Sequence, residues 1–329
     1  MKKIINHPAD AVEEMLDGIS AVHPSILYRI QNTRVLASKY KNAGKVGLVS
    51  GGGSGHEPSH AGFVGKGMLS AAVCGDVFTS PSPDQILEAI KASEQGAGVF
   101  LIIKNYSGDV MNFEMAKELA EMEGIQVDYA IVDDDIAVED STYTSGRRGV
   151  AGTIFVHKIL GAAAEQGYSL QEIKQLSEQL IPNIKTLGLA LSPATVPEVG
   201  KPGFSLDEDE IEFGIGIHGE PGYRREKLQP SKELALELYE KIKKELSLTS
   251  KDQVVILVNG MGSTPLMEQY IFAKDVMSLL TKDKITVSNQ LVGNYMTAID
   301  MAGISLTILR LKDSKWLEWI NQPVETIAW

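Results

Sequence analysis

KVGLVSGGGSGHEPSH, residues 45–60, is the stretch that decides the fold of this chain. Its apolar run, Val46–Val49, is typical of a short buried strand. Glycines follow at positions 51, 52, 53 and 55, and glycine lets a backbone approach a ligand closely. Ligands of open α/β sheets bind outside the carboxyl ends of the strands. The stretch therefore predicts a ligand site formed by Gly53, Ser54, Gly55 and His56.

Three known motifs partly match this stretch, and each fails. The dinucleotide fingerprint needs a glycine where His56 or Pro58 stands. The phosphate loop needs Ser or Thr where Gly67 follows Lys66. His56–His60 fits the zinc pattern H-E-x-x-H, but Pro58 fits only the first turn of a helix, and no third ligand follows at a suitable spacing. We therefore expect neither a nucleotide nor a metal ion on this chain.

Composition narrows the class of protein. A length of 329 residues suggests about two domains, and 43% hydrophobic residues are enough for a sizeable core. A net charge of −12 argues against nucleic acid or an anionic membrane as a partner. Cys74 is the single cysteine, so a disulfide framework is excluded. With no long apolar run and no signal-peptide core at the N-terminus, we expect a soluble cytoplasmic protein.

The order of elements predicts an α/β fold. Apolar runs at 71–73, 98–103 and 125–132 are expected strands, and helical patterns lie between them. This alternation predicts a mainly parallel sheet with helices on both faces. Prolines at 193, 197 and 202 mark a boundary. We expect a first α/β domain over 1–192, with the glycine-rich loop, and a smaller α/β domain of α+β character over 193–329.

Several local signals predict where elements begin and end. Ser82 and Ser169 each open a helix with a capping box, and the second helix is expected to reach about Leu187. The run 211–217 (IEFGIGI) predicts a strand broken by glycines, and 305–309 predicts the last strand. Thr264 before Pro265 predicts another helix N-cap.

Four polar residues follow expected strands and are candidates for chemistry: His56, Lys104, Asp109 and His218. Strand ends of a parallel sheet converge on one crevice, which would bring these side chains together. Ordinary roles remain open for each: a loop histidine, an exposed lysine, an N-cap aspartate and a surface histidine. The run Asp133–Asp135 predicts a solvated loop rather than a metal site.

The four candidates suit a small carbonyl substrate. A neutral imidazole is a nucleophile, and a carbonyl carbon is its natural target. Lys104 or the backbone of the glycine loop would polarise the carbonyl oxygen. Asp109 and His56 would take protons from substrate hydroxyls. These residues alone do not name the reaction.

Longer motifs resemble a known family. The runs 47–81, KNYSGDVMNFEMA, GRRGVAGT, FGIGIHGEPG and LVNGMGSTP resemble the dihydroxyacetone kinase family over nearly the whole chain, and most closely its bacterial K subunit, which depends on the phosphotransferase system. The resemblance implies that His218 forms a covalent hemiaminal with the ketone carbon of dihydroxyacetone and that His56 acts in acid/base catalysis. It also implies that Lys104, Asp109 and the loop from Gly53 to His56 contact the substrate.

The same resemblance implies partners. It predicts a phosphoenolpyruvate–glycerone phosphotransferase in which a separate L subunit carries the nucleotide and magnesium, and a phosphotransfer M subunit acts indirectly. It implies a homodimer. A second possibility is a K-like paralogue that binds dihydroxyacetone and serves a transcriptional regulator. A third is a binding protein for another small carbonyl compound. Arg147 and Arg148 are candidates for the surface that meets the L subunit or for binding phosphate.

Overall fold

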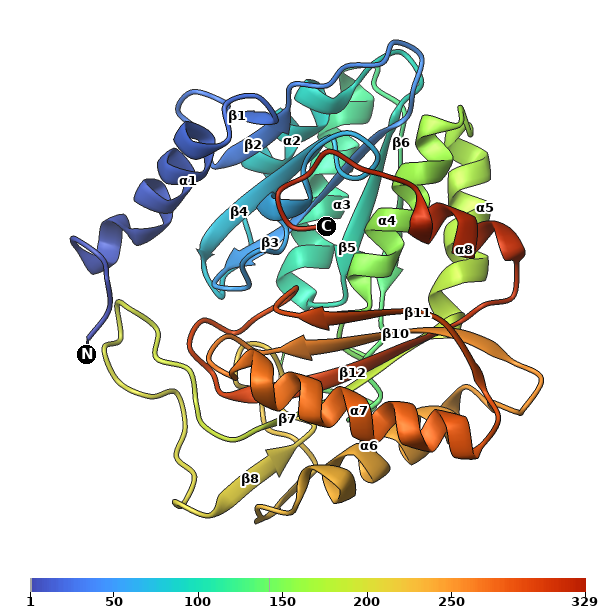
Figure 1. Cartoon of the computed structure of the whole chain (residues 1–329). Coiled ribbons are helices and arrows are strands. Elements are labelled where there is room, and N and C mark those ends of the chain that lie inside the picture. Colours follow the sequence, from blue (N-terminus) through green and yellow to red (C-terminus); the bar gives the residue numbers. More distant parts are fainter. Residues whose placement is uncertain (1, 142) are drawn as a thin grey trace.

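Two six-stranded sheets form the frame of the molecule (Figure 1). The structure is a computed structural model that describes residues 2–141 and 143–329. Each sheet has helices packed against it, and the predicted α/β class is confirmed. Among the described residues, no helix has both the length and the apolar character needed to cross a bilayer.

The first sheet has the order β1-β2-β4-β3-β5-β6. The neighbouring strands β4, β3, β5 and β6 are parallel to one another, whereas β2 pairs antiparallel with both β4 and the edge strand β1. The bounds are β1 Leu27–Arg29, β2 Val35–Ser38, β3 Gly47–Ser54, β4 Ala71–Val77, β5 Val99–Lys104 and β6 Val127–Val132.

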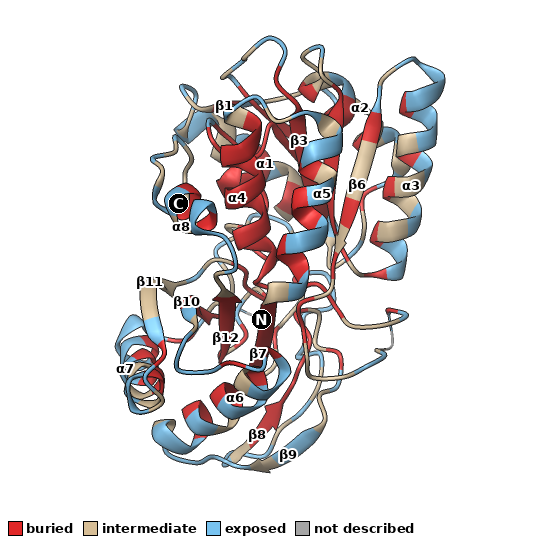
Figure 2. Ribbon diagram, turned by 90° about the vertical axis from the view of Figure 1, so that its right-hand side faces the viewer, coloured by how far each residue is buried: buried red, intermediate tan, exposed pale blue. Residues whose placement is uncertain are grey.

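Helices cover both faces of this sheet. On one face, α2 (Pro83–Ser93) and α3 (Ser107–Met122) pack their apolar sides on the strands. On the other face lie α1 (Ala11–Val22), α4 (Thr153–Glu165) and α5 (Leu170–Leu180). Nearly every residue of α4 is buried, as the red ribbon in Figure 2 shows. The short 3₁₀ helices are η1 Pro8–Asp10, η2 Ala61–Phe63 and η3 Ile181–Asn183.

The second sheet has the order β11-β10-β12-β7-β8-β9 and is mainly antiparallel, with only β10 and β11 parallel. Its strands are β7 Ile184–Ala190, β8 Glu210–Phe213, β9 Arg224–Lys227, β10 Gln253–Gly260, β11 Thr286–Gly293 and β12 Gly303–Arg310. The helices α6 (Ser231–Glu245) and α7 (Leu266–Lys282) pack on one face. The core that contains α4 also takes in Val255, Leu257 and Leu309, so the two sheets share apolar packing.

The C-terminal segment returns to the first sheet (Figure 1). Helix α8 (Ser314–Asn321) packs on α4, and Lys158 of α4 donates hydrogen bonds to the carbonyl oxygens of Trp319 and Gln322, each at 2.7 Å. Beyond α8, the backbone N–H of Ile327 donates to the carbonyl of Gly62. The chain end is thus fixed beside the loop that follows β3.

Some element bounds differ from the sequence predictions. The helix expected to reach Leu187 ends at Leu180, because Pro182 breaks it and the residues that follow pair with other strands as β7. β7 pairs with β12 and β8, so the two sheets part at residues 181–183, while the division at residue 193 stays a prediction. The expected strand 211–217 stops at Phe213, where Gly214 takes a φ of +76°. Strand β11 was not predicted.

The helix starts show one success and two corrections. Ser169 and Glu172 form the predicted capping box of α5. Ser82 and Pro83 do start α2, but the Gln85 side chain instead accepts from the Arg34 backbone N–H, so this box is absent. The N-cap of α7 is Pro265, because the Thr264 hydroxyl is hydrogen-bonded to the backbone of Gly303.

Candidate functional site

Gly51, Gly52 and Gly53 lie within β3 rather than in a loop, because β3 runs to Ser54, and Gly55 directly follows the strand. Gly52 has a φ of +146°, and a Cβ there would lie 2.5 Å from the Nζ atom of Lys104. A Cβ on Gly53 would lie 2.6 Å from the backbone nitrogen of Thr79. Because glycine has no side chain, Gly52 leaves room for Lys104, and Gly53 leaves room for the segment between β4 and α2.

His56 and His218 face one another although 162 positions separate them in the chain. Their Nε2 atoms are 3.1 Å apart, and the two rings meet edge to face. His56 is fully buried, and its Nδ1 lies 2.7 Å from the carbonyl oxygen of Thr297. The His218 side chain keeps 12% exposure, so it is the more accessible of the two. The structure thus brings two predicted site residues into contact.

Lys104 and Asp109 form the second part of the site. Lys104 ends β5, and its Nζ lies 3.5 Å from an Asp109 carboxylate oxygen and 3.4 Å from the carbonyl of Gly51. Asp109 lies in the first turn of α3, but Tyr106 is the N-cap, so the alternative of a simple cap is wrong. Both side chains are almost completely buried. A buried pair of opposite charge is a costly arrangement and is typical of functional sites.

The strand that precedes His218 is not the kind that was predicted. His56 and Lys104 do follow parallel strands, β3 and β5. His218 instead lies in the segment after β8, a strand of the mainly antiparallel second sheet. The packing of the two sheets, and not a shared row of parallel strand ends, therefore brings the imidazoles together.

Three residues that the sequence did not single out complete the surroundings. The ring of Phe78 stacks on His56 with centroids 5.2 Å apart, and the Tyr106 ring meets His218 edge to face at 4.5 Å. The Ser80 hydroxyl donates to the Asp109 carboxylate. Phe78 and Ser80 belong to the segment between β4 and α2. Their signal in the sequence is proximity to the end of β4, a parallel strand beside β3.

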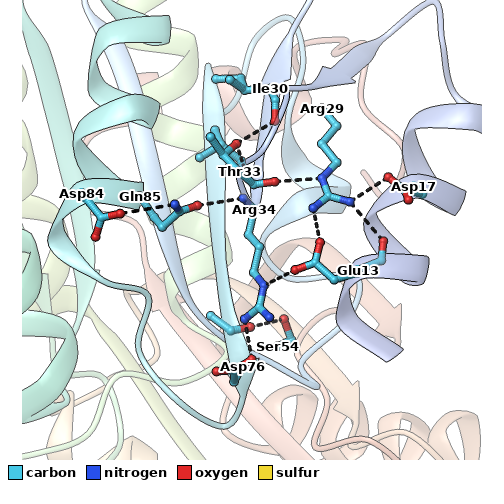
Figure 3. Close-up of polar contacts among 12 residues, drawn as sticks. Glu13, Asp17, Arg29, Ile30, Thr33, Arg34, Ser54, Asp76, Asp84 and Gln85 are labelled. Carbon is cyan, nitrogen blue, oxygen red and sulfur yellow. Dashed lines mark hydrogen bonds and ion pairs between the residues drawn. The ribbon is translucent and has the colours of Figure 1, made fainter. Parts of the chain in front are cut away.

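The end of β4, just before this segment, is tied to the outer elements by ion pairs, which Figure 3 shows. Arg34 binds Asp76 of β4 and also Glu13 of α1, and Arg29 binds Glu13 and Asp17. These groups line a polar cleft of 810 Å³. Because several of the carboxylates are well exposed, each pair contributes at most about 1 kcal/mol. Arg29 and Arg34, which line this cleft, are each already paired with carboxylates.

Glu220 lies behind His218. Its carboxylate is buried, and one oxygen is 3.0 Å from His218 Nδ1 while the other accepts the His218 backbone N–H at 2.9 Å. Arg148, which is also fully buried, binds Asp135 and the carbonyl of Gly214. Arg148 is therefore not available as a docking surface, contrary to one sequence expectation. Arg147 pairs with Glu139 and Glu245.

The aspartate run is not the solvated loop that was predicted. Asp134 is completely buried and accepts the backbone N–H groups of Val150 and Gly152 and the hydroxyl of Thr186. Asp135 is buried against Arg148. Both residues thus fix the segment that leads into α4. Their role is to hold buried backbone and Arg148 in place, not to keep a loop in water.

The second histidine of the H-E-x-x-H pattern points elsewhere. His60 is buried, and its Nδ1 lies 2.9 Å from Nε2 of His157 on α4. Glu57 accepts the backbone N–H of Gly55. His56 and His60 therefore do not share a ligand position.

Burial and neighbouring charges set the protonation of these groups. Burial lowers the pKa of His56 well below its usual value, and His218 and Lys104 lower it further. Burial would raise the pKa of Glu220, but His218 and Arg148 outweigh this effect and lower the pKa to about 2. At neutral pH the site therefore holds an ionised Glu220 beside a neutral His56. Such a site can supply a nucleophilic ring nitrogen, a proton carrier and a lysine cation.

Comparison with known proteins gives a consistent result. The model of the Dak1 domain matches residues 17–328. A protein of Listeria innocua named PTS-dependent dihydroxyacetone kinase 1, dihydroxyacetone-binding subunit DhaK, is 64% identical over 329 residues, which cover 100% of both chains.

Two solved structures share the fold. The dihydroxyacetone kinase operon co-activator DhaQ is 48% identical, with a TM-score of 0.91 over 96% of this chain and 98% of that one. The dihydroxyacetone kinase of C. freundii is 36% identical, with a TM-score of 0.92, and the match covers 100% of this chain and 60% of that one. All three proteins are named for dihydroxyacetone kinase or its operon.

Proposed function

Because this chain belongs to the Dak1 domain family, we propose that it is the dihydroxyacetone-binding subunit of a kinase that depends on the phosphotransferase system. The observation that carries the proposal is the full-length identity of 64% to a subunit of that name. The contact between His56 and His218, with Lys104 and Asp109 beside them, supports it.

In the proposed reaction, Nε2 of His218 attacks the ketone carbon of dihydroxyacetone and forms a hemiaminal. The carbonyl oxygen takes a proton that His56 Nε2 relays from solvent, and Lys104 stabilises the developing negative charge. The covalent bond holds a ligand that offers few other contacts, and it excludes glycerol, which has no carbonyl carbon. In this proposal, the backbone of Gly53, Ser54 and Gly55 contacts the substrate, because bare backbone lets a small ligand approach closely.

The held substrate then receives a phosphoryl group from a nucleotide on a separate L subunit, which an M subunit recharges. Asp109 accepts the proton of the attacking hydroxyl, and Ser80 and Lys104 hold its carboxylate. Phosphoryl transfer depends mainly on positioning and charge stabilisation, and the covalent tether supplies the positioning. The nucleotide and magnesium belong to the partner in this proposal.

The experiment is carbon NMR with dihydroxyacetone labelled at the ketone carbon. The wild-type chain should convert the trigonal carbon signal to a tetrahedral one, and His218→Ala should leave it trigonal. Addition of L subunit, phosphotransfer proteins and phosphoenolpyruvate should then yield triose phosphate. A tetrahedral signal that persists in His218→Ala would sink the proposal, and glycerol serves as the ligand control.

A second candidate is a coactivator that senses dihydroxyacetone, favoured by the 48% identity to DhaQ over nearly the full length. It would form the same adduct but would bind a transcriptional regulator instead of the L subunit. A binding assay with the purified L subunit, with and without dihydroxyacetone, separates the two. Triose phosphate formation excludes a purely regulatory role. The higher identity to the kinase subunit favours the kinase.

A further inference from the structure

Behind His218 lies a chain of buried charges that the proposed reaction does not yet use. Glu220, Arg148 and Asp135 follow one another inward from the histidine, and all three side chains are nearly inaccessible. Arg148 contacts Asp135 through Nε at 2.8 Å and through Nη2 at 2.7 Å, and its Nη1 has no hydrogen-bond partner among residues 2–141 and 143–329. Unpaired buried donors are rare, so the arrangement calls for a function.

Gly216 shows how close Glu220 and Arg148 lie. A Cβ at Gly216 would be 1.9 Å from a Glu220 carboxylate oxygen and 2.7 Å from Nη1 of Arg148. The free donor of Arg148 thus lies beside the carboxylate that holds His218. In a buried site this charge acts at low dielectric, and it keeps the carboxylate ionised.

Hydrogen-bond partners assign the ring protons. The carbonyl of Thr297 only accepts, so Nδ1 of His56 carries a hydrogen. The ionised carboxylate of Glu220 also only accepts, so Nδ1 of His218 carries a hydrogen. The Nε2 lone pair of His218 then faces Nε2 of His56 at 3.1 Å.

We infer that Glu220 is the positioning residue of His218: it fixes the tautomer whose Nε2 is nucleophilic and balances the ring cation that forms on attack. The inference rests on the proposed function. When Nε2 bonds to the ketone carbon, the π electron pair moves to oxygen, and that oxygen takes a proton that His56 Nε2 relays from solvent. The adduct ring keeps its Nδ1 hydrogen and a positive charge, which the Glu220 carboxylate neutralises, and the Arg148 cation nearby keeps that carboxylate ionised.

The test uses the full chain with ¹⁵N-labelled histidine. In the free wild type, long-range ¹H–¹⁵N correlation should show His218 with a protonated Nδ1. In Glu220→Gln the amide both donates and accepts, so this tautomer should no longer dominate. The rate of adduct formation should fall by about 10²- to 10⁴-fold, as when a carboxylate that orients a catalytic histidine is lost. Glu220→Asp should keep the tautomer and recover part of the rate.

The matched control is Glu212→Gln. Glu212 is also a buried glutamate and accepts the backbone N–H of Gly222 near the same segment, but it does not contact His218. This variant should keep the tautomer and the rate. If Glu220→Gln keeps both, the inference is overturned. Because the tautomer is measured without substrate, this result is independent of whether the wild type forms an adduct.

Discussion

At the scale of single residues, the site depends on positions where no side chain fits. At Gly52 the backbone of β3 passes close to the Lys104 ammonium, and the φ of +146° at this glycine lies outside the range that L-residues favour. A side chain there would push the Lys104 ammonium away from the Asp109 carboxylate. The glycine-rich stretch is therefore required for the charge arrangement as well as for access by a ligand.

Gly52→Ala tests this requirement. We expect a loss of about 1–3 kcal/mol of stability from backbone strain, together with loss of the dihydroxyacetone adduct, because the new Cβ meets Lys104 Nζ. The control is Gly44→Ala, which also has a positive φ, +80°, but meets nothing within 4 Å. Thermal unfolding and carbon NMR report the two effects. An intact adduct in Gly52→Ala would contradict the expected displacement of Lys104.

At the scale of elements, α7 and β11 leave a surface for association. Exposed apolar side chains gather on the first turns of α7: Leu266, Met267, Tyr270 and Ile271. β11 is the terminal strand of its sheet, and edge strands can pair with another copy across a two-fold axis. We propose that this surface joins two copies of the chain, in agreement with the homodimer that the family resemblance implies.

Tyr270→Lys with Met267→Lys should therefore convert the dimer to a monomer, because both charges would be buried at a self-complementary interface. Light scattering after gel filtration measures the mass, which should halve. The control replaces Val199 and Leu228, which are similarly exposed but lie outside this surface, with lysine. A wild type that is monomeric at micromolar concentration would refute the proposal.

At the scale of the whole molecule, buried histidines link folding to pH. His56, His60 and His157 are fully buried, and burial lowers the pKa of each, that of His157 to about 3. In the unfolded chain these histidines become protonated as the pH falls through about 6.5, whereas in the folded chain they stay neutral at that pH. Stability from these groups is therefore complete above that pH and declines as the pH falls below it.

Between pH 7 and pH 5 each buried histidine should remove about 2 kcal/mol from the free energy of unfolding. Urea unfolding at several pH values measures the slope. His157→Gln should make the slope shallower, whereas Ser93→Ala, a buried substitution that removes no titratable group, should leave it unchanged. An unchanged slope in His157→Gln would show that this histidine is protonated in the folded state.

The sequence by itself determined the α/β class, most of the elements of the first sheet and the family. Local signals sufficed there: apolar runs define the strands, the Ser169 box caps α5, and the glycines mark the ligand strand. His56, Lys104 and Asp109 were found because they closely follow parallel strands. His218 was chosen from its flanking glycines and from the family motif.

Only the tertiary structure decided the rest. The first residues of β7 were predicted to be the end of a helix. They form a strand because they pair with β12, which lies more than a hundred residues away in the chain. The burial of Asp134, Asp135, Arg148 and Glu220 depends on packing between the two halves, since charged residues read as exposed in any local pattern. The contact of His56 with His218 likewise exists only because the two sheets share a core, and no spacing along the chain encodes it.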